Sequence, residues 1–277
     1  MDDLSAVPIR DVLTQAERRL ERLLKRNDGH YSKFNGTAGF PTDAGTWVRL
    51  AWRRPGSFNS DRWTGFEAST AISGVPKPRW TAAATWSDTD RDVVWRADEM
   101  TLVPSASISQ QADLPQDAQL SERWWSDLYT ALDNLAGHST TRVCVTQDHL
   151  SARVREIYGA TLDTTVTEWT CAHGDLGYAN VCGPTLAILD WEEWGLAPAG
   201  WDAACLWSAS LTVPAVADHV LDLFSDVLST RAGMLSRLLL CANTARSHKR
   251  TGRAGLQTAT MARAAEALVR ELRSDQV

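Results

Sequence analysis

Residues 171–206 read CAHGDLGYANVCGPTLAILDWEEWGLAPAGWDAACL, and this stretch decides the predicted fold and chemistry. Asp175 follows His173 by two residues and precedes Asn180 by five, and Asp190 ends an apolar strand. Phosphoryl transfer to a hydroxyl needs a carboxylate that orients the hydroxyl and accepts its proton. It also needs a second carboxylate and a neutral oxygen ligand that hold Mg²⁺ against a triphosphate. A loop carrying Asp175 and Asn180, closed by a hairpin whose next strand ends in Asp190, can bring these groups together.

The composition restricts the class of protein. The chain has 277 residues, a formal net charge of −6, 44% hydrophobic and 22% charged residues, which is ordinary for a globular protein of one large domain or two lobes. The acidic balance argues against a binder of nucleic acid or anionic membranes. We expect no membrane span, because no apolar stretch approaches 18 residues, and no signal peptide, because the chain opens with acids. We therefore expect a cytoplasmic protein. Five cysteines without a CxxC pair predict free thiols.

The hydrophobic pattern predicts a strand-rich first part and a helical second part. A polar, Ser- and Gln-rich stretch at residues 104–115 predicts a linker between them. In the first part we expect a helix at 9–26, strands at 30–34, 46–52, 79–85 and 93–102, a glycine-containing loop at 36–45 and a short helix at 59–72. In the second part we expect helices at 121–135, 149–158, 215–228, 234–247 and 258–273.

The ordered set HGDxxxxN followed by LDWE resembles the aminoglycoside phosphotransferase and choline kinase-like branch of the protein kinase-like fold. The wider pattern H-G-D-L-x-x-x-N-V…I-L-D-W-E-x-W-G-x-A-P…D-A-A is especially similar to phosphotransferase-family proteins of actinobacteria. The resemblance is strong over about residues 120–245 and weaker over the first hundred. It implies an α+β, two-lobed protein kinase-like fold. A small β-rich N-terminal lobe (residues 1–103) would bind ATP, and a larger helical C-terminal lobe (residues 104–277) would supply catalysis and bind the acceptor.

The resemblance also implies roles for residues of the second lobe. Asp175 would be the catalytic base, Asn180 and Asp190 the Mg²⁺ ligands, and His173 would brace the catalytic loop without reacting. Asp202 matches a position that supports this loop from the following helix. Candidates for contact with the acceptor are Glu193, Trp194 and Asp202, with Glu192, Trp191 and Trp201 beside them.

In the first lobe, the resemblance places Arg49 where the family has a phosphate-binding strand residue, usually Lys. Glu67 would be its ion-pair partner on the helix, and the backbone of Thr101, Leu102 and Val103 would contact adenine as a hinge. Arg and Lys are not equivalent, because Arg grips phosphate bidentately. The nucleotide-covering loop has no GxGxxG, and the family's usual second His is Gly177 here. The catalytic loop would therefore differ in shape or leave space for the acceptor.

Several of these residues also have a purely structural interpretation. Asp175 could cap a turn, and Asp190 could simply end its strand. Arg49 could lie on the solvated side of a strand, and Glu67 on a helix surface. The tryptophans could pack in the core instead of lining an acceptor pocket.

The predicted function is an ATP- and Mg²⁺-dependent phosphotransferase that moves the γ-phosphate to a hydroxyl of a small molecule, aminoglycoside-like or another metabolite. A first alternative is a kinase of Ser or Thr in a ribosomal precursor peptide. In such natural-product (lanthipeptide-like) biosynthesis a partner lyase then eliminates the phosphate. Residues 104–119 and the basic patch at 246–253 could serve that peptide or partner. A second alternative is a non-catalytic pseudokinase binding subunit. The sequence leaves the acceptor, ATP versus GTP, oligomeric state and partner requirement open.

Overall fold

The computed structural model describes residue 4 and residues 6–32, 36–57, 59–255 and 257–274. The chain divides into two compact units, the first formed by Met1–Ala71 and Lys77–Pro104 and the second by Ile72–Pro76 and Ser105–Val277. All five cysteines are free, as the sequence predicts. Within the described ranges, no helix combines the length and the apolar character that crossing a bilayer requires.

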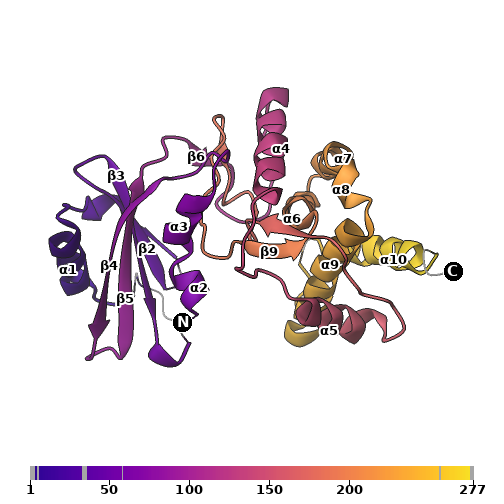
Figure 1. The fold of residues 1–277 in the computed structure, drawn as a ribbon, viewed down its shortest axis with the longest axis horizontal. Helices are drawn as coiled ribbons and strands as arrows, with labels where there is room; N and C mark the ends of the chain where they lie inside the picture. The colour runs from indigo at the N-terminus through magenta and orange to yellow at the C-terminus, as the bar shows by residue number, and fades with distance from the viewer. Residues whose placement is uncertain (1–3, 5, 33–35, 58, 256, 275–277) are drawn as a thin grey trace. The chain divides into compact units, whose positions relative to one another are not determined.

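The first unit is built on a five-stranded antiparallel sheet with strand order β1-β2-β3-β5-β4 (Figure 1). The strands are β1 (His30–Tyr31), β2 (Thr37–Pro41), β3 (Thr46–Arg53), β4 (Trp80–Asp88) and β5 (Val93–Thr101). The predictions for β3, β4 and β5 are confirmed within a few residues. Residues 33 and 34 of the first predicted strand lie outside the described residues.

The prediction of a loop throughout residues 36–45 is wrong, because β2 occupies half of it. β2 pairs with β3 across a tight turn, with Gly39 opposite Arg49 and Pro41 opposite Trp47. The indole of Trp47 covers Gly39 so closely that a Cβ there would lie 2.1 Å from the ring. Glycine is therefore a packing requirement within a strand here, and not the mark of a loop.

Helices lie on both sides of this sheet (Figure 1). On one side, α1 (Arg10–Leu20) buries Val12, Leu13, Ala16 and Leu20 in a core shared with β2, β3 and β5. The other side carries α2 (Ser60–Trp63), α3 (Gly65–Ala68) and the 3₁₀ turn Ser69–Ala71.

Two helices predicted in this unit are shorter than expected. The predicted helix at 9–26 ends at Leu20, because Glu21 takes a left-handed φ of 55° and Leu24 pairs with Thr42 in a β-bridge. The predicted helix at 59–72 is divided into three short pieces, with Thr64 ending the first of them at φ −106°. Each piece is a single turn, so packing against the sheet must hold these turns in place.

The second unit is mainly helical, as the sequence predicts. Its helices are α4 (Glu122–Ala136), α5 (Gln147–Tyr158), α6 (Trp201–Ser210), α7 (Pro214–Leu223), α8 (Ser225–Leu228), α9 (Arg231–Thr251) and α10 (Thr258–Ser274). Its short strands are β6 (Ala106–Ser107), β7 (Trp169–Ala172), β8 (Cys182–Gly183) and β9 (Gly195–Pro198). α9 is the central helix and contacts α5, α6, α8 and α10. It continues to Thr251, so most of the basic patch at 246–253 belongs to this helix.

The segment predicted as a linker is instead hydrogen-bonded into the second unit. β6 pairs with β8, and the Ile108 backbone N–H donates to the Val181 carbonyl (2.9 Å). The Leu114 N–H donates to the Ala209 carbonyl (2.8 Å), and the Leu114 side chain is only 1% exposed. The polar side chains suggest a linker, but backbone pairing and one buried leucine hold the segment in place.

Candidate active site

Asp175 and Asn180 lie together on the loop that follows β7. The side-chain amide of Asn180 donates to the backbone carbonyl of Asp175 (2.8 Å), and its nitrogen lies 3.4 Å from the Asp175 carboxylate oxygen Oδ2. The Asn180 backbone N–H donates to the Gly177 carbonyl (2.9 Å), which turns the chain back on itself. Asp175 is exposed. The loop therefore presents a solvent-accessible carboxylate with an amide held beside it.

Asp190 is brought to this loop by pairing between neighbouring segments. Val181 and Ile188 form an antiparallel bridge, and the Leu189 N–H donates to the Asn180 carbonyl (2.8 Å). Asp190 then adopts a left-handed φ of 59°, a conformation that Asp tolerates better than most residues. Asp175, Asn180 and Asp190 thus lie on adjoining stretches of backbone.

One carboxylate oxygen of Asp190 fits a divalent cation. Oδ1 is buried and has no hydrogen-bond partner among the residues that the structure describes. Burying a carboxylate oxygen without a partner is costly, and a hard cation with oxygen ligands would remove that cost. The described part of the chain holds no group of three or more His, Cys, Asp or Glu arranged for a metal. One carboxylate and one amide oxygen suit Mg²⁺, which keeps waters and phosphate oxygens as its other ligands.

His173 connects the start of the loop to the segment before Asp190. Its ring is fully buried, and Nε2 lies 2.7 Å from the Leu189 carbonyl oxygen. A carbonyl oxygen only accepts, so Nε2 carries the proton and donates. The ring packs edge-on against Trp191, with centroids 4.9 Å apart. These contacts fix the position of the ring, as the predicted role of His173 in bracing the loop requires.

Asp202, near the start of α6, holds the loop through its backbone. Its two carboxylate oxygens accept hydrogen bonds from the N–H groups of His173 (2.6 Å) and Gly174 (3.0 Å). Burial raises the pKa of Asp202, and His173 and the two backbone donors partly oppose that shift. The neighbouring Trp201 donates from Nε1 to the Gly174 carbonyl (3.0 Å). The sequence leaves two roles open for Asp202, support of the loop and contact with the acceptor. These contacts favour support of the loop.

The absence of a side chain at Gly177 does not leave space for an acceptor. A Cβ there would lie 3.0 Å from the Cβ of Ala112, in the segment predicted as a linker. The Tyr178 N–H also donates to the Ala112 carbonyl (2.8 Å). The chain itself therefore fills the position that a histidine would occupy.

The segment after Asp190 is held by Arg142. Its guanidinium donates from Nε to the Trp194 carbonyl (3.0 Å) and from Nη2 to the Glu192 carbonyl (3.0 Å), and it lies 4.6 Å from the centre of the Trp194 ring. Trp194 and Trp191 are 5% and 1% exposed, so both side chains are packed in the interior, and their contact with an acceptor stays a prediction. Glu193 is half-buried and stays an acceptor candidate.

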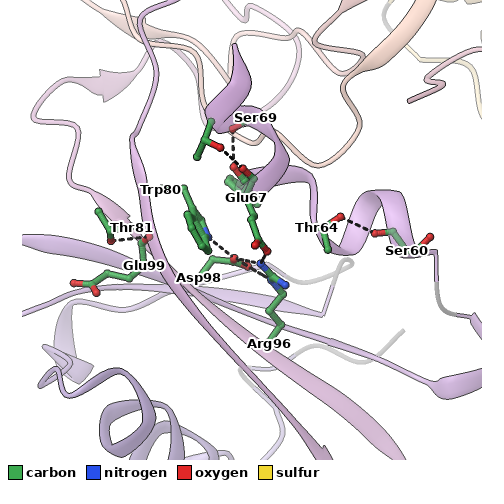
Figure 2. A network of polar contacts seen from close by, with 11 residues as sticks. Ser60, Thr64, Glu67, Ser69, Trp80, Thr81, Arg96, Asp98 and Glu99 are labelled. Atoms are coloured by element: carbon green, nitrogen blue, oxygen red, sulfur yellow. Dashed lines mark hydrogen bonds and ion pairs between the residues drawn. The ribbon is translucent and has the colours of Figure 1, made fainter. Parts of the chain in front are cut away.

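In the first unit, Glu67 forms an ion pair with Arg96, a residue that the sequence analysis missed (Figure 2). Arg96 Nη2 lies 3.0 Å from the Glu67 carboxylate, and Arg96 also contacts Asp98. Arg49, the expected partner, places its guanidinium 4.9 Å from the centre of the Phe66 ring. A signal for Arg96 was present in the sequence, because Arg96 and Asp98 are two residues apart in an apolar strand and so face the same side.

The predicted hinge follows the last strand of the sheet. Thr101 ends β5, and its hydroxyl accepts a hydrogen bond from the Arg79 backbone N–H (2.9 Å). Leu102 is 44% exposed and Val103 is half-buried. An exposed leucine at this position offers an apolar contact for a flat ring.

The comparisons with known proteins establish the fold. No protein-family profile and no curated protein sequence matches the chain. Among solved structures, it is similar to amicoumacin kinase hAmiN in complex with AMP-PNP, Ca²⁺ and Ami, with a TM-score of 0.61 at 10% identity over 97% of this chain and 95% of that one. It is also similar to aminoglycoside phosphotransferase APH(4)-Ia, with a TM-score of 0.55 at 13% identity over 86% of this chain and 91% of that one.

A thermostable mutant of APH(4)-Ia, solved in ternary complex with ADP and hygromycin B, gives a TM-score of 0.53 at 13% identity, covering 86% of this chain and 92% of that one. At these identities the similarity shows the fold alone. The predicted α+β kinase-like fold, with a small β-rich lobe and a larger helical lobe, is confirmed.

Proposed function

We propose that this chain is an ATP- and Mg²⁺-dependent phosphotransferase whose acceptor is a hydroxyl group of a small molecule. The observation that carries the proposal is the loop of the second unit. It presents Asp175 to solvent and holds Asn180 beside it. It also places Asp190, with one unpaired buried oxygen, directly after Leu189, whose backbone N–H donates to the Asn180 carbonyl. The fold supports it, because the similar solved structures are kinases whose complexes hold AMP-PNP with Ca²⁺ or ADP.

In this mechanism Asp175 orients the acceptor hydroxyl and accepts its proton as the oxygen attacks the γ-phosphate. Asn180 directs its amide nitrogen to Asp175, so its amide oxygen would hold the cation, and Asp190 would contribute Oδ1. The cation, when bound, neutralises charge on the phosphates. His173 and Asp202 keep the loop in this geometry and take no part in the chemistry. Positioning supplies most of the rate in such a reaction.

In the first unit, Arg49 would contact the phosphates and residues Thr101–Val103 would contact the adenine. Arg49 is well suited to phosphate, because its planar guanidinium matches two phosphate oxygens at once.

A small-molecule acceptor is favoured over a precursor peptide. The similar structures are kinases of small molecules by name, and one holds hygromycin B. One of the two segments that could serve a peptide is engaged within the second unit, because residues 106–112 pair with the catalytic-loop region. In the basic patch, Arg246 forms an ion pair with Glu156 (3.3 Å), and residues 247–253 are exposed. The half-buried Glu192 and Glu193 next to Asp190 suit an acceptor that carries amines.

The test combines nucleotide binding with transfer. Calorimetry with AMP-PNP and Mg²⁺ measures binding, and intact-mass analysis with ATP, Mg²⁺ and a panel of aminoglycosides and other hydroxylated metabolites detects a phosphate adduct. Asp175→Asn should keep nucleotide binding and slow transfer by about 10²–10⁴, whereas Asp190→Asn should weaken Mg²⁺-dependent binding. Asp218→Asn, which changes an exposed carboxylate on α7, is the matched control. Wild-type protein that does not bind Mg²⁺–AMP-PNP would contradict the proposal and favour the pseudokinase alternative.

A further inference from the structure

Strand β4 forms one edge of the sheet in the first unit (Figure 1). Among the residues that the structure describes, β5 is the strand that pairs with it, and its other side has no strand. β4 has 9 residues, whereas β1 at the opposite edge has 2. A bulge interrupts the register between Trp80 and Ala82, so the regular part of the edge is Ala82–Asp88. A long, regular edge is a template for pairing with a further strand.

The unpaired backbone groups of this edge belong to every second residue. At the end of β5, the Thr101 N–H donates to the Arg79 carbonyl (2.9 Å). Because backbone groups alternate in direction along a strand, the odd-numbered residues of β5 point to β4, and their partners there are the even-numbered residues. The odd-numbered residues Ala83, Thr85 and Ser87 therefore direct their N–H and C=O groups away from the sheet.

The side chains of the edge leave room for a neighbouring strand. Ala83, Thr85 and Ser87 are small and exposed, and Ala84 and Trp86 pack toward the core beneath α1. Edge strands that avoid pairing usually carry Lys, Pro or inward-pointing charges, and residues 82–87 contain none of these. The bulge protects only the start of the strand.

The charges at the two ends of β4 favour a second copy of this chain as the partner. Arg79 directly precedes β4, and Asp90 lies in the turn that follows it. Both are exposed, and neither forms an ion pair within the described ranges of the chain. Antiparallel pairing of two copies places the basic start of each strand against the acidic end of the other. Parallel pairing would place like charges together, which is unfavourable.

One register satisfies both the backbone and the charges. With Thr85 opposite Thr85 of the second copy, Ala83 lies opposite Ser87, so the outward-directed residues form the hydrogen-bonded pairs. The whole regular part of the strand is then paired. The bulge adds one residue before this part, which brings Arg79 opposite Asp90 of the second copy.

We propose that this chain forms a symmetric dimer in which β4 pairs antiparallel with β4 of a second copy. The two sheets join into one, and the three outward-directed residues of each strand make about six backbone hydrogen bonds across the two-fold axis. An ion pair between Arg79 and Asp90 closes each end. The inference does not depend on the proposed function, because no residue assigned to the nucleotide, the cation or the acceptor lies in β4.

Sedimentation equilibrium of the full chain over a range of concentrations measures the dimer dissociation constant. Thr85→Pro removes an outward-directed N–H and spares the hydrogen bonds to β5. Since Thr85 faces itself across the axis, two hydrogen bonds are lost and the dissociation constant should rise by about thirtyfold or more. Thr85→Ser keeps the N–H and is the matched control, with an unchanged constant. A wild type that stays monomeric up to about 1 mM, or a Thr85→Pro dimer as tight as the wild type, overturns the inference.

Charge reversal tests the register. Arg79→Glu and Asp90→Arg should each raise the dissociation constant by about tenfold, because each substitution occurs twice in the dimer. The double variant exchanges the two charges and should restore the constant to within about threefold of the wild type. Arg123→Glu on α4, whose side chain is 90% exposed, is the matched control and should change nothing. A double variant that stays as weak as the single ones, or an equal loss in Arg123→Glu, overturns the inference.

Folding and the location of the interface are checked separately. Circular dichroism identifies variants that do not fold. If Thr85→Pro is among them, the charge exchange decides alone, because Arg79 and Asp90 are exposed. Hydrogen–deuterium exchange of peptides covering residues 82–88 should slow as the wild-type concentration rises through the dissociation constant. Slower exchange at another surface in place of β4 would show a dimer of different architecture and overturn the inference.

Discussion

Replacing Gly174 with alanine should destabilise the second unit for two separable reasons. Gly174 has a φ of 94°, where an L-residue is strained, which costs about 2 kcal/mol. A Cβ would also lie 2.7 Å from the Cys144 sulfur and 2.8 Å from the Glu193 carbonyl oxygen, and overpacking of this kind costs about 1–3 kcal/mol more. The total of about 4 kcal/mol corresponds to a fall in Tm of about 8–16 °C for a unit of this size.

Thermal unfolding followed by circular dichroism measures the effect, and Gly159→Ala separates its two causes. Gly159 has a φ of 101°, and no atom lies within 4 Å of its Cβ position, so Gly159→Ala should lose only the strain of about 2 kcal/mol. In a Cys144→Ala background, the cost of Gly174→Ala should fall by about 1 kcal/mol because one of the two contacts is removed. Equal melting temperatures for Gly174→Ala and Gly159→Ala would refute the close approach of the loop to Cys144 and Glu193.

Three further predictions follow from other contacts. Arg142→Met removes both hydrogen bonds to the segment after Asp190, so the Mg²⁺ concentration for half-maximal AMP-PNP binding should rise in a titration; an unchanged value would show that Arg142 does not act on Asp190. Gly177→His should lower the unfolding free energy by about 1–3 kcal/mol, because its side chain meets the 105–114 segment; wild-type stability in urea would contradict that packing. The Arg91 hydrogen bonds lower the pKa of Asp11, and those from Trp95 and Arg91 lower the pKa of Asp88 despite its burial. Their stabilising effect is therefore present above the unfolded pKa of about 3.9 and lost as the pH falls through the lower folded pKa. The difference in urea midpoint between wild type and Arg91→Gln should accordingly be present at neutral pH and disappear in acid, and a difference that persists at low pH would contradict this linkage.

The sequence by itself determined what depends on short separations along the chain. Asp175 and Asn180 share one loop, and Asp190 follows it by ten residues, so spacing alone predicted their proximity. The predicted apolar strand before Asp190 is reduced to a single bridge between Val181 and Ile188. The amphipathic helices α4, α5 and α10 and the strands β3 to β5 were equally readable, because their apolar residues repeat with the period of a helix or a strand.

Only the tertiary structure decided the partners that come from distant segments. Glu67 pairs with Arg96, twenty-nine residues away, because the register between β3 and β5 and the position of α3 place Arg96 beneath that carboxylate. The 105–114 segment covers Gly177 for a similar reason: its backbone pairs with a strand more than seventy residues later, and its polar side chains give no sign of this pairing. Such pairings depend on where whole elements pack, and the local pattern of one segment does not contain that information.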